Sequence, residues 1–186
     1  MTFDLYEGMR EAKRLQGKNM EKTLAAVNKM LELGIIADYA IGGGMAAMFY
    51  MEPVLTYDLD IFCVLTGEGK GLNILAPIYK WAERAGYKTF KEHLLIEGLP
   101  VQFIPVYNDL IREAVESSVR KKIGSVKARV VAPEYLVAIM LQTSRKKDAV
   151  NVLKMLEETK IDRPALSKIL KKYGLAEKFS ALEGPL

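Results

Sequence analysis

The stretch from Tyr39 to Val64, YAIGGGMAAMFYMEPVLTYDLDIFCV, constrains the fold of this chain more than any other segment. Asp58 and Asp60 interrupt an apolar run that otherwise has the composition of a buried strand. Aspartate is depleted in strands, so two of them here need a reason. In a strand, residues i and i+2 project from the same face, about 7 Å apart. Two carboxylates at that spacing repel each other unless a cation lies between them. The pair therefore predicts a site for Mg²⁺, a hard ion that binds carboxylates, water and phosphate oxygens.

A glycine triplet precedes the carboxylate pair. Gly42, Gly43 and Gly44 follow a predicted strand over Ala37–Ile41 and precede a predicted short helix over Met45–Met51. Glycines permit a tight backbone and let a phosphate approach the N–H groups. The start of a helix favours an anion as well. The triplet therefore predicts a phosphate-binding turn, with an ordinary strand-to-helix turn as the alternative.

The composition indicates a folded globular protein, because half of the 186 residues are hydrophobic and only 7 are prolines. The single Cys63 excludes an internal disulfide framework and a zinc site built on several cysteines, and its place in the strand predicts a core residue. His93 is the only histidine, and we interpret it as structural because no nucleophile elbow accompanies it. We recognise no signal peptide and no run of about 20 apolar residues, so we expect a cytoplasmic protein with no membrane partner.

Basic residues gather in one late segment although the net charge is only +4. From Arg120 to Asp148 there are eight lysines and arginines against two acids. Such a segment suits a polyanion such as RNA or a nucleoside triphosphate, with a solvated basic face as the alternative. Arg145, Lys146 and Lys147 fall in the predicted first turn of a helix, where the helix dipole disfavours cations. Asp148, a substrate phosphate or RNA would compensate them; solvated loop positions are the alternative.

The hydrophobic periodicities predict an α/β (α+β) fold with a small mixed sheet, flanking helices and a C-terminal helical extension. We place a boundary near Pro133, between an α/β domain with N-terminal helices over residues 1–132 and a helical subdomain over 133–186. The predicted helices cover 4–33 (in two pieces that break near Gly17), 45–51 (ending at Pro53), 72–85, 108–117, 133–141, 145–158, 163–172 and 175–183. The predicted strands are 37–41, the strand of Asp58 and Asp60, a hairpin over 87–106 turning at Glu97-Gly98, and a pair over 120–131 turning at Gly124. A glycine-rich loop is predicted over 66–71.

The order of strand, glycine turn, short helix and D-x-D strand resembles the nucleotidyltransferase superfamily, whose core is similar to the palm of DNA polymerase beta. Thr56 fits the T-x-D-x-D form of that motif. The segment over residues 132–156, APEYLVAIMLQTSRKKDAVNVLKML, is similar to the helical tail of the family, with its proline-opened helix and R-x-K-D signature. More narrowly, the chain resembles small prokaryotic nucleotidyltransferases related to abortive-infection toxins.

The resemblance implies a protein that binds a nucleoside triphosphate with two Mg²⁺ ions and transfers a nucleotidyl group to an RNA, protein or small-molecule acceptor. It implies that Asp58 and Asp60 are catalytic and hold the metal. It implies nucleotide-binding roles for Gly42, Gly43, Gly44, Thr56, Arg145, Lys146 and Lys147. A partner protein, as in a toxin–antitoxin pair, is a further expectation.

Three positions depart from the pattern of the family. Gln102 stands on the strand where active members place a third carboxylate, and glutamine neither accepts a proton nor binds Mg²⁺ well. Val54 stands where toxin-like members often have an arginine, and Met140 replaces a lysine of the helical tail. Glu97 or Asp109 would have to approach from the ends of the strand to supply the carboxylate. The alternative function is therefore a non-catalytic protein of the same fold that binds a nucleotide or RNA, or acts as a toxin–antitoxin component.

Overall fold

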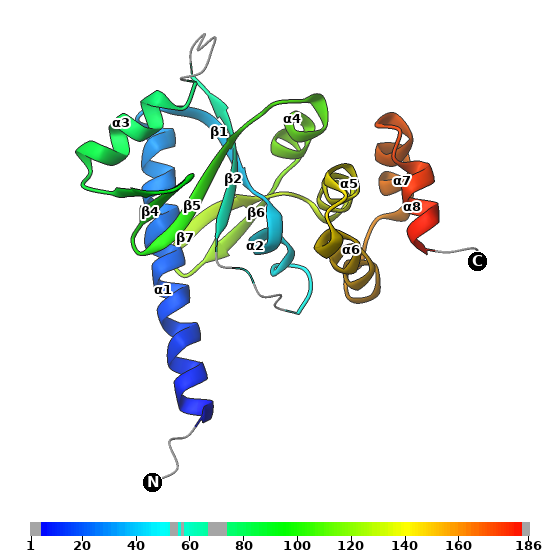
Figure 1. Cartoon of the computed structure of the whole chain (residues 1–186), viewed down its shortest axis with the longest axis horizontal. Helices are drawn as coiled ribbons and strands as arrows, with labels where there is room; N and C mark the ends of the chain where they lie inside the picture. Colours follow the sequence, from blue (N-terminus) through cyan, green and yellow to red (C-terminus); the bar gives the residue numbers. More distant parts are fainter. Residues whose placement is uncertain (1–4, 53–55, 57, 67–73, 184–186) are drawn as a thin grey trace.

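The computed structural model describes residues 5–52, 56, 58–66 and 74–183, with side chains described from residue 17 onward. These residues form a mixed sheet of seven strands in the order β3-β4-β5-β2-β1-β7-β6 (Figure 1). The strands are β1 (Ile36–Ile41), β2 (Leu59–Leu65), β3 (Lys88–Phe90), β4 (His93–Ile96), β5 (Leu99–Pro105), β6 (Val119–Ile123) and β7 (Val126–Val130). β2 pairs antiparallel with β1 and parallel with β5, so the strand of the carboxylate pair lies at the centre of the sheet.

The centre of the sheet is apolar on both faces. Ile61, Phe62 and Cys63 are consecutive in β2, and all three are buried. A strand covered on both sides shows such a continuous hydrophobic run in place of alternation. Cys63 is fully buried, and burial raises the pKa of its thiol to about 12, so it is a core residue as predicted.

The first helix, α1 (Leu5–Glu32), is continuous through Gly17, so the predicted break is wrong. A single glycine inside a helix costs only about 1 kcal/mol relative to alanine. That cost is small beside the burial of Leu24, Val27 and Met30, which α1 packs against the sheet. Figure 1 shows α1 crossing one face of the sheet, with its N-terminal half extending beyond the body of the protein.

The remaining helices flank the sheet or form a group beside it (Figure 1). They are α2 (Gly43–Ala47), α3 (Ala76–Arg84), α4 (Asp109–Glu116), α5 (Pro133–Thr143), α6 (Lys146–Glu158), α7 (Arg163–Lys172) and α8 (Ala176–Glu183). α2 and α4 contact β2, and α5 contacts both of them as well as α6 and α7. Leu136–Leu141 of α5 are buried without interruption, so α5 joins the helical group to the rest of the core.

The predicted fold class is confirmed, because the structure is a mixed α/β arrangement. The predicted turns at Glu97-Gly98 and Gly124 are also present, each with a positive φ angle that a tight hairpin requires. The helix after the glycine triplet begins at Gly43 and ends at Ala47, earlier at both ends than predicted. Pro53, Val54 and most of the predicted loop over 66–71 lie outside the described residues. The domain boundary near residue 132 stays a prediction.

Within the described part of the chain, no helix is both long enough and apolar enough to cross a membrane.

Candidate functional site

The two carboxylates lie at the start of the central strand. Asp58 immediately precedes β2, and Asp60 is its second residue, paired in register with Gln102 of β5. Burial, followed by the neighbouring charge of Asp58, raises the pKa of Asp60 to about 6. The cations Arg145 and Lys147 act against this shift, so they are close enough to influence the carboxylate. The protein therefore holds a partly buried carboxylate beside a second one, an arrangement that a bound cation would stabilise.

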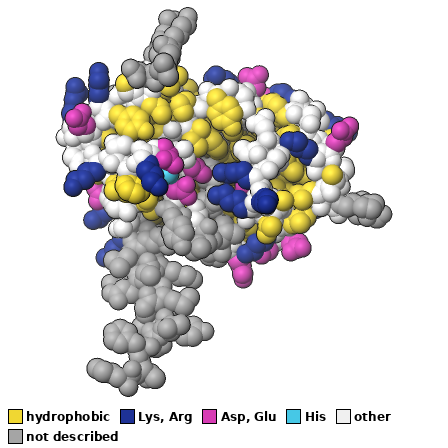
Figure 2. All heavy atoms as spheres, in the orientation of Figure 1, with side chains coloured by type: hydrophobic (Ala, Val, Ile, Leu, Met, Phe, Trp, Pro, Cys, Tyr) yellow, Lys and Arg dark blue, Asp and Glu magenta, His cyan; other side chains and the backbone are white. Residues whose placement is uncertain are grey.

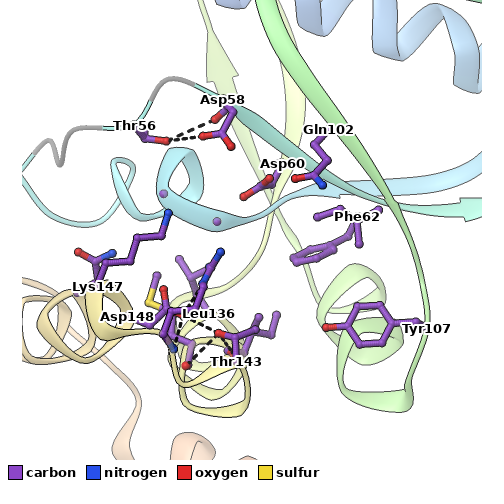
Figure 3. A pocket seen from close by; sticks show the side chains of 17 residues that line it. Thr56, Asp58, Asp60, Phe62, Gln102, Tyr107, Leu136, Thr143, Lys147 and Asp148 are labelled. Carbon is purple, nitrogen blue, oxygen red and sulfur yellow. Dashed lines mark hydrogen bonds and ion pairs between the residues drawn. The ribbon is translucent and has the colours of Figure 1, made fainter. Parts of the chain in front are cut away.

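The glycine turn is shaped around these side chains. Gly43 has a φ angle of 59°, and a Cβ atom at this position would overlap the carboxylate of Asp60. A Cβ atom at Gly42 would overlap the ring of Phe62. Thr56 donates a hydrogen bond from Oγ1 to Oδ1 of Asp58 at 3.2 Å, which fixes one oxygen of that carboxylate (Figure 3). Side chains are thus excluded at Gly42 and Gly43 because Phe62 and Asp60 occupy the space that a Cβ atom would need.

A cavity of about 230 Å³ opens between this turn and the helices α5 and α6 (Figure 3). One water molecule needs about 10–15 Å³ of such space, so the cavity has room for more than a single ion. The residues that line it are Gly43, Gly44, Thr56, Asp58, Asp60, Phe62, Gln102, Ile104, Tyr107, Leu136, Ile139, Met140, Thr143, Arg145, Lys147, Asp148 and Asn151. Predicted site residues from two distant segments therefore meet in one place.

The basic wall of the cavity is built at the junction of α5 and α6. Arg145 is the N-cap residue of α6, and its Nε donates to Oδ2 of Asp148 at 2.8 Å. Thr143 donates to the same oxygen at 2.6 Å. Burial alone would raise the pKa of Asp148, but the hydrogen bonds from Arg145 and Thr143 outweigh it and lower this pKa. Asp148 is thus the anion that compensates Arg145 at the start of α6, and it also positions that side chain.

Lys147 extends from α6 toward α2 and the two aspartates in Figure 3. Its neighbour Lys146, which we predicted to bind nucleotide, lines a different hollow that also contains Lys178. Successive residues of a helix point about 100° apart, so adjacent lysines face different sides. Figure 2 shows basic and acidic side chains gathered next to each other near the middle of one face.

The other basic residues of the late segment lie on the β6–β7 hairpin. Arg129 does not face solvent freely, because its guanidinium binds Asp38 at 2.8 Å and Ser118. Arg120, Lys122 and Lys127 are exposed. None of these four residues lines the cavity. The predicted polyanion surface is therefore divided, with only Arg145 and Lys147 at the carboxylate pair.

Asp148 is the third carboxylate among the described residues that line the cavity, but it is bound to Arg145 and Thr143. Gln102 lies opposite Asp60 and lines the cavity, as its place in the sequence indicated. Glu97 sits in the β4–β5 turn and accepts a hydrogen bond from Tyr87 at 3.0 Å, and Asp109 is exposed in the first turn of α4. Neither lines the cavity. Across the described residues, no three His, Cys, Asp or Glu side chains are gathered closely enough to form a ready metal site.

The structure adds one residue that the sequence did not suggest. Nε2 of His93, on β4, lies 3.7 Å from Oδ2 of Asp58. Leu94 pairs with Val101 in the β4–β5 ladder, so the same register places His93 beside Gln102. The two segments are 35 positions apart in the chain, and only the strand order β4-β5-β2 brings them together. The pattern of residues around His93 carries no signal of this contact.

The architecture is that of the nucleotidyltransferase fold, as three comparisons with solved structures show. An antigenic nucleotidyltransferase-like protein from Paracoccidioides brasiliensis has a TM-score of 0.54 and 14% identity, over 88% of this chain and 91% of its own. The solution structure of the antibiotic-resistance factor ANT(2'')-Ia has a TM-score of 0.52 and 14% identity, over 90% of this chain and 95% of its own. A crystal structure of ANT(2")-Ia in complex with adenylyl-2"-tobramycin has a TM-score of 0.53 and 16% identity, over 88% of this chain and 98% of its own.

No protein-family model matches the sequence, and no curated protein matches it. The expected nucleotidyltransferase fold is thus confirmed by its structural neighbours. The narrower resemblance to abortive-infection toxins stays a prediction.

Proposed function

We propose that this protein binds a nucleoside triphosphate together with a divalent cation and transfers a nucleotidyl group from it to a hydroxyl acceptor. One observation carries the proposal: Asp58 and Asp60 share a cavity with the cations Arg145 and Lys147. Carboxylates alone would suit a metal ion, and cations alone would suit an anion. A triphosphate with its metal needs both, because Asp58 and Asp60 would hold the cation while Arg145 and Lys147 would bind the phosphate oxygens.

The residues present fit such a metal. The raised pKa of Asp60 shows a carboxylate that lacks compensation, and the buried Nε2 of His93 beside Asp58 has no hydrogen-bond partner among the described residues. Asp58 and Asp60 would hold the ion, with Thr56 orienting Asp58. When bound, a divalent cation supplies charge neutralisation of the phosphates and polarisation of the acceptor oxygen.

The remaining residues of the cavity divide between the phosphates and the base. Arg145, fixed by Asp148, and Lys147 would bind phosphate oxygens, and the bare backbone of Gly43 and Gly44 lets them come close. Phe62 and Tyr107 form an aromatic side of the cavity in Figure 3, and Tyr107 is 60% exposed. A nucleobase can stack on such a ring with little dependence on its identity.

In the transfer, the acceptor oxygen forms a bond to the α-phosphorus, the bond to the α–β bridging oxygen breaks, and pyrophosphate leaves. Gln102 cannot take the proton of the acceptor, because a neutral amide is not a base. Asp60 lies opposite it in the sheet and is a carboxylate that can. The adenylyl-2"-tobramycin bound to ANT(2")-Ia supports a small hydroxyl compound as the first acceptor class to test, with RNA ends and protein hydroxyls as the others.

A second candidate function follows from Gln102 itself. If the neutral side chain opposite Asp60 prevents turnover, the protein is a non-catalytic nucleotide-binding or RNA-binding module of this fold, such as a toxin–antitoxin component. Both candidates require the same ligand in the same cavity, so binding does not distinguish them. Turnover does.

Calorimetry with each of the four ribonucleoside triphosphates, with and without Mg²⁺ or Mn²⁺, tests the binding. We expect metal-dependent binding that Asp58→Asn abolishes and Glu83→Gln leaves unchanged, because Glu83 is an exposed carboxylate of α3 outside the cavity. No binding at millimolar nucleotide would overturn both candidates. A pyrophosphate-release assay with the three acceptor classes then separates them: release that Asp60→Asn eliminates supports transfer, and binding without release supports the non-catalytic module.

A further inference from the structure

A second hollow lies beside the carboxylate cavity, between the helices α5, α6 and α8. Its volume is about 370 Å³, within the range of about 300–1,000 Å³ that is common for small-molecule sites. The two hollows share Met140 and Arg145, but this one contains Lys146 in place of Lys147. The residues that line this α6–α8 hollow are Met140, Leu141, Ser144, Arg145, Lys146, Ala149, Val152, Lys178, Ala181 and Leu182. The proposed nucleotidyl transfer uses neither this space nor Lys146.

The walls of the α6–α8 hollow are mostly apolar. Six of its ten lining residues are apolar, with two each from α5, α6 and α8, and none of the ten is acidic. The apolar surface continues along α6 to Leu153, which lies one turn beyond Ala149 on the same side of the helix and is 39% exposed. An apolar chain placed in the hollow would remove this surface from water, which is favourable.

Three cations line the same hollow. Arg145 pairs with Asp148, the acid in the first turn of α6, and Lys146 in that turn is exposed with no carboxylate partner among the described residues. Lys178 uses two of its donors at the C-terminal end of α5, one of them to Oγ of Ser144 at 2.9 Å. An ammonium group has three donors, so Lys178 has one left for a ligand. The hollow therefore presents uncompensated positive charge.

The charged residues and the apolar residues of α6 and α8 lie toward different ends of the hollow. Lys146 is two positions along the chain from Ser144, and Lys178 is hydrogen-bonded to Ser144, so both lysines belong to the end next to α5. Val152 lies six residues further along α6, and Leu182 lies four residues further along α8. A hollow with cations at one end and apolar walls beyond them fits a ligand that has an anionic head and an apolar chain.

We propose that the α6–α8 hollow binds a single-chain fatty carboxylate, with its carboxylate on Lys146 and Lys178 and its alkyl chain on the apolar walls. A carboxylate fits the available donors better than a phosphate does. A phosphate monoester carries a charge of about −1.5 to −2 and three acceptor oxygens, whereas the guanidinium that lines the hollow, Arg145, is held by Asp148. Two ammonium groups match the two oxygens of a carboxylate. The site is separate from the proposed transfer and holds whether or not the carboxylate cavity binds a triphosphate.

Calorimetry with decanoate tests the proposal on the full chain, at about pH 8 and 0.15 M salt and below the concentration at which decanoate forms micelles. We expect saturable binding, and binding about tenfold weaker for octanoate, because two fewer methylene groups are removed from water. Decyltrimethylammonium, with the same chain length and the opposite charge, should not bind. Equal affinities for octanoate and decanoate would overturn the proposal, as would tighter binding of decyltrimethylammonium or decyl phosphate than of decanoate.

Lys146→Gln and Lys147→Gln are a matched pair that tests the head of the ligand. We expect Lys146→Gln to weaken decanoate binding about three- to tenfold, because a hydrogen bond to a charged group is lost at an exposed position. Lys147→Gln should change decanoate binding less than about twofold, since Lys147 lines the other cavity. This order is the reverse of the one expected for a triphosphate. Equal weakening in both variants would indicate general charge attraction and overturn the proposal.

Ala181→Trp and Ser180→Trp test the place of the chain. Both positions are exposed on α8, but Ala181 lines the α6–α8 hollow and Ser180 lines a different hollow against α7. We expect Ala181→Trp to weaken decanoate binding at least about tenfold, because the new side chain overfills the hollow, and Ser180→Trp to leave it unchanged. Decanoate binding that survives in Ala181→Trp, or that a bound triphosphate abolishes in the wild type, would place the ligand elsewhere and overturn the proposal.

Discussion

At the scale of single residues, the carboxylate pair is an unfavourable arrangement, because burial and the charge of Asp58 both oppose the ionisation of Asp60. Burial and the charge of Asp58 raise the pKa of Asp60 from 3.8 to about 6. When the pKa of a carboxyl group is higher in the folded state than in the unfolded state, the protonated group stabilises the fold. This stabilisation is complete at a pH below the unfolded-state pKa, and it is lost as the pH rises through the folded-state pKa. The cation-free protein should therefore lose stability between about pH 4 and pH 7, because Asp60 becomes charged while it is still buried beside Asp58.

Asp60→Asn tests this pH dependence. At 1.36 kcal/mol per pKa unit, the loss is at most about 3 kcal/mol, so we expect the variant to exceed the wild type by about 1–3 kcal/mol at pH 7 to 8 in EDTA. Below pH 4 the two proteins should unfold at similar urea concentrations. Glu83→Gln, at an exposed position, should show no such pH-dependent gain. An Asp60→Asn variant that is less stable than the wild type at pH 8 would contradict the prediction.

Gly43 gives a second prediction at this scale, and the chain supplies its control. Both Gly43 and Gly174 have positive φ angles, 59° and 65°, but only at Gly43 would a Cβ atom overlap another group, the carboxylate of Asp60. Gly174→Ala should lose about 1–2 kcal/mol of stability from backbone strain alone and retain metal binding. Gly43→Ala should lose more and bind Mn²⁺ poorly, because Asp60 is displaced. If the two variants lose equal stability and both still bind Mn²⁺, the position of the Asp60 carboxylate does not depend on Gly43.

At the scale of elements, helix α6 directs two adjacent lysines into different hollows. Lys147 lines the cavity with Arg145, and Lys146 lines another hollow. A charge-assisted hydrogen bond to phosphate contributes about 1.5–3 kcal/mol, which is about tenfold or more in affinity. We expect Lys147→Gln to weaken triphosphate binding by that factor and Lys146→Gln to change it less than about twofold at 0.15 M salt, where distant charges are screened. Calorimetry at matched ionic strength measures the triphosphate affinity of both variants. Equal weakening in the two would indicate general charge attraction and not a specific contact of Lys147.

The elements also show which parts of this site could be predicted from the sequence. The strand of Asp58 and Asp60, the glycine turn and the helix start at Arg145 follow from local patterns, because each is set by neighbours within a few positions. Gln102 opposite Asp60 was predictable from the resemblance and is present in the β2–β5 register. His93 beside Asp58 was not predictable, since that contact depends on the order of three strands. The break near Gly17 was wrong because tertiary burial outweighed a local helix propensity.

At the scale of the whole molecule, the cavity is formed by both parts of the predicted division near residue 132. One side comes from α2, β2 and β5, and the other from α5 and α6. No linker separates them, because Val131 donates a backbone hydrogen bond to Ile41 of β1 and α5 begins two residues later. Ligand binding should therefore stabilise both parts together, through mass action on a single folded state.

The buried face of α5 yields the last prediction, on the fragment of residues 1–132. Leu136, Val137, Ile139, Met140 and Leu141 are all buried, and α5 contacts α2 and α4 of the fragment. At about 2 kcal/mol for each large apolar side chain, their burial contributes about 10 kcal/mol, which is comparable to the 5–15 kcal/mol that stabilises a typical domain. We expect the isolated fragment to show no cooperative urea transition and no near-ultraviolet circular dichroism signal. Co-expression with residues 133–186 should restore both signals, together with Mn²⁺ binding. The opposite result would be an isolated fragment that unfolds cooperatively and binds Mn²⁺ without residues 133–186. It would establish the division near residue 132 as a true domain boundary, and it would place the whole metal site within the sheet and the turn that faces it.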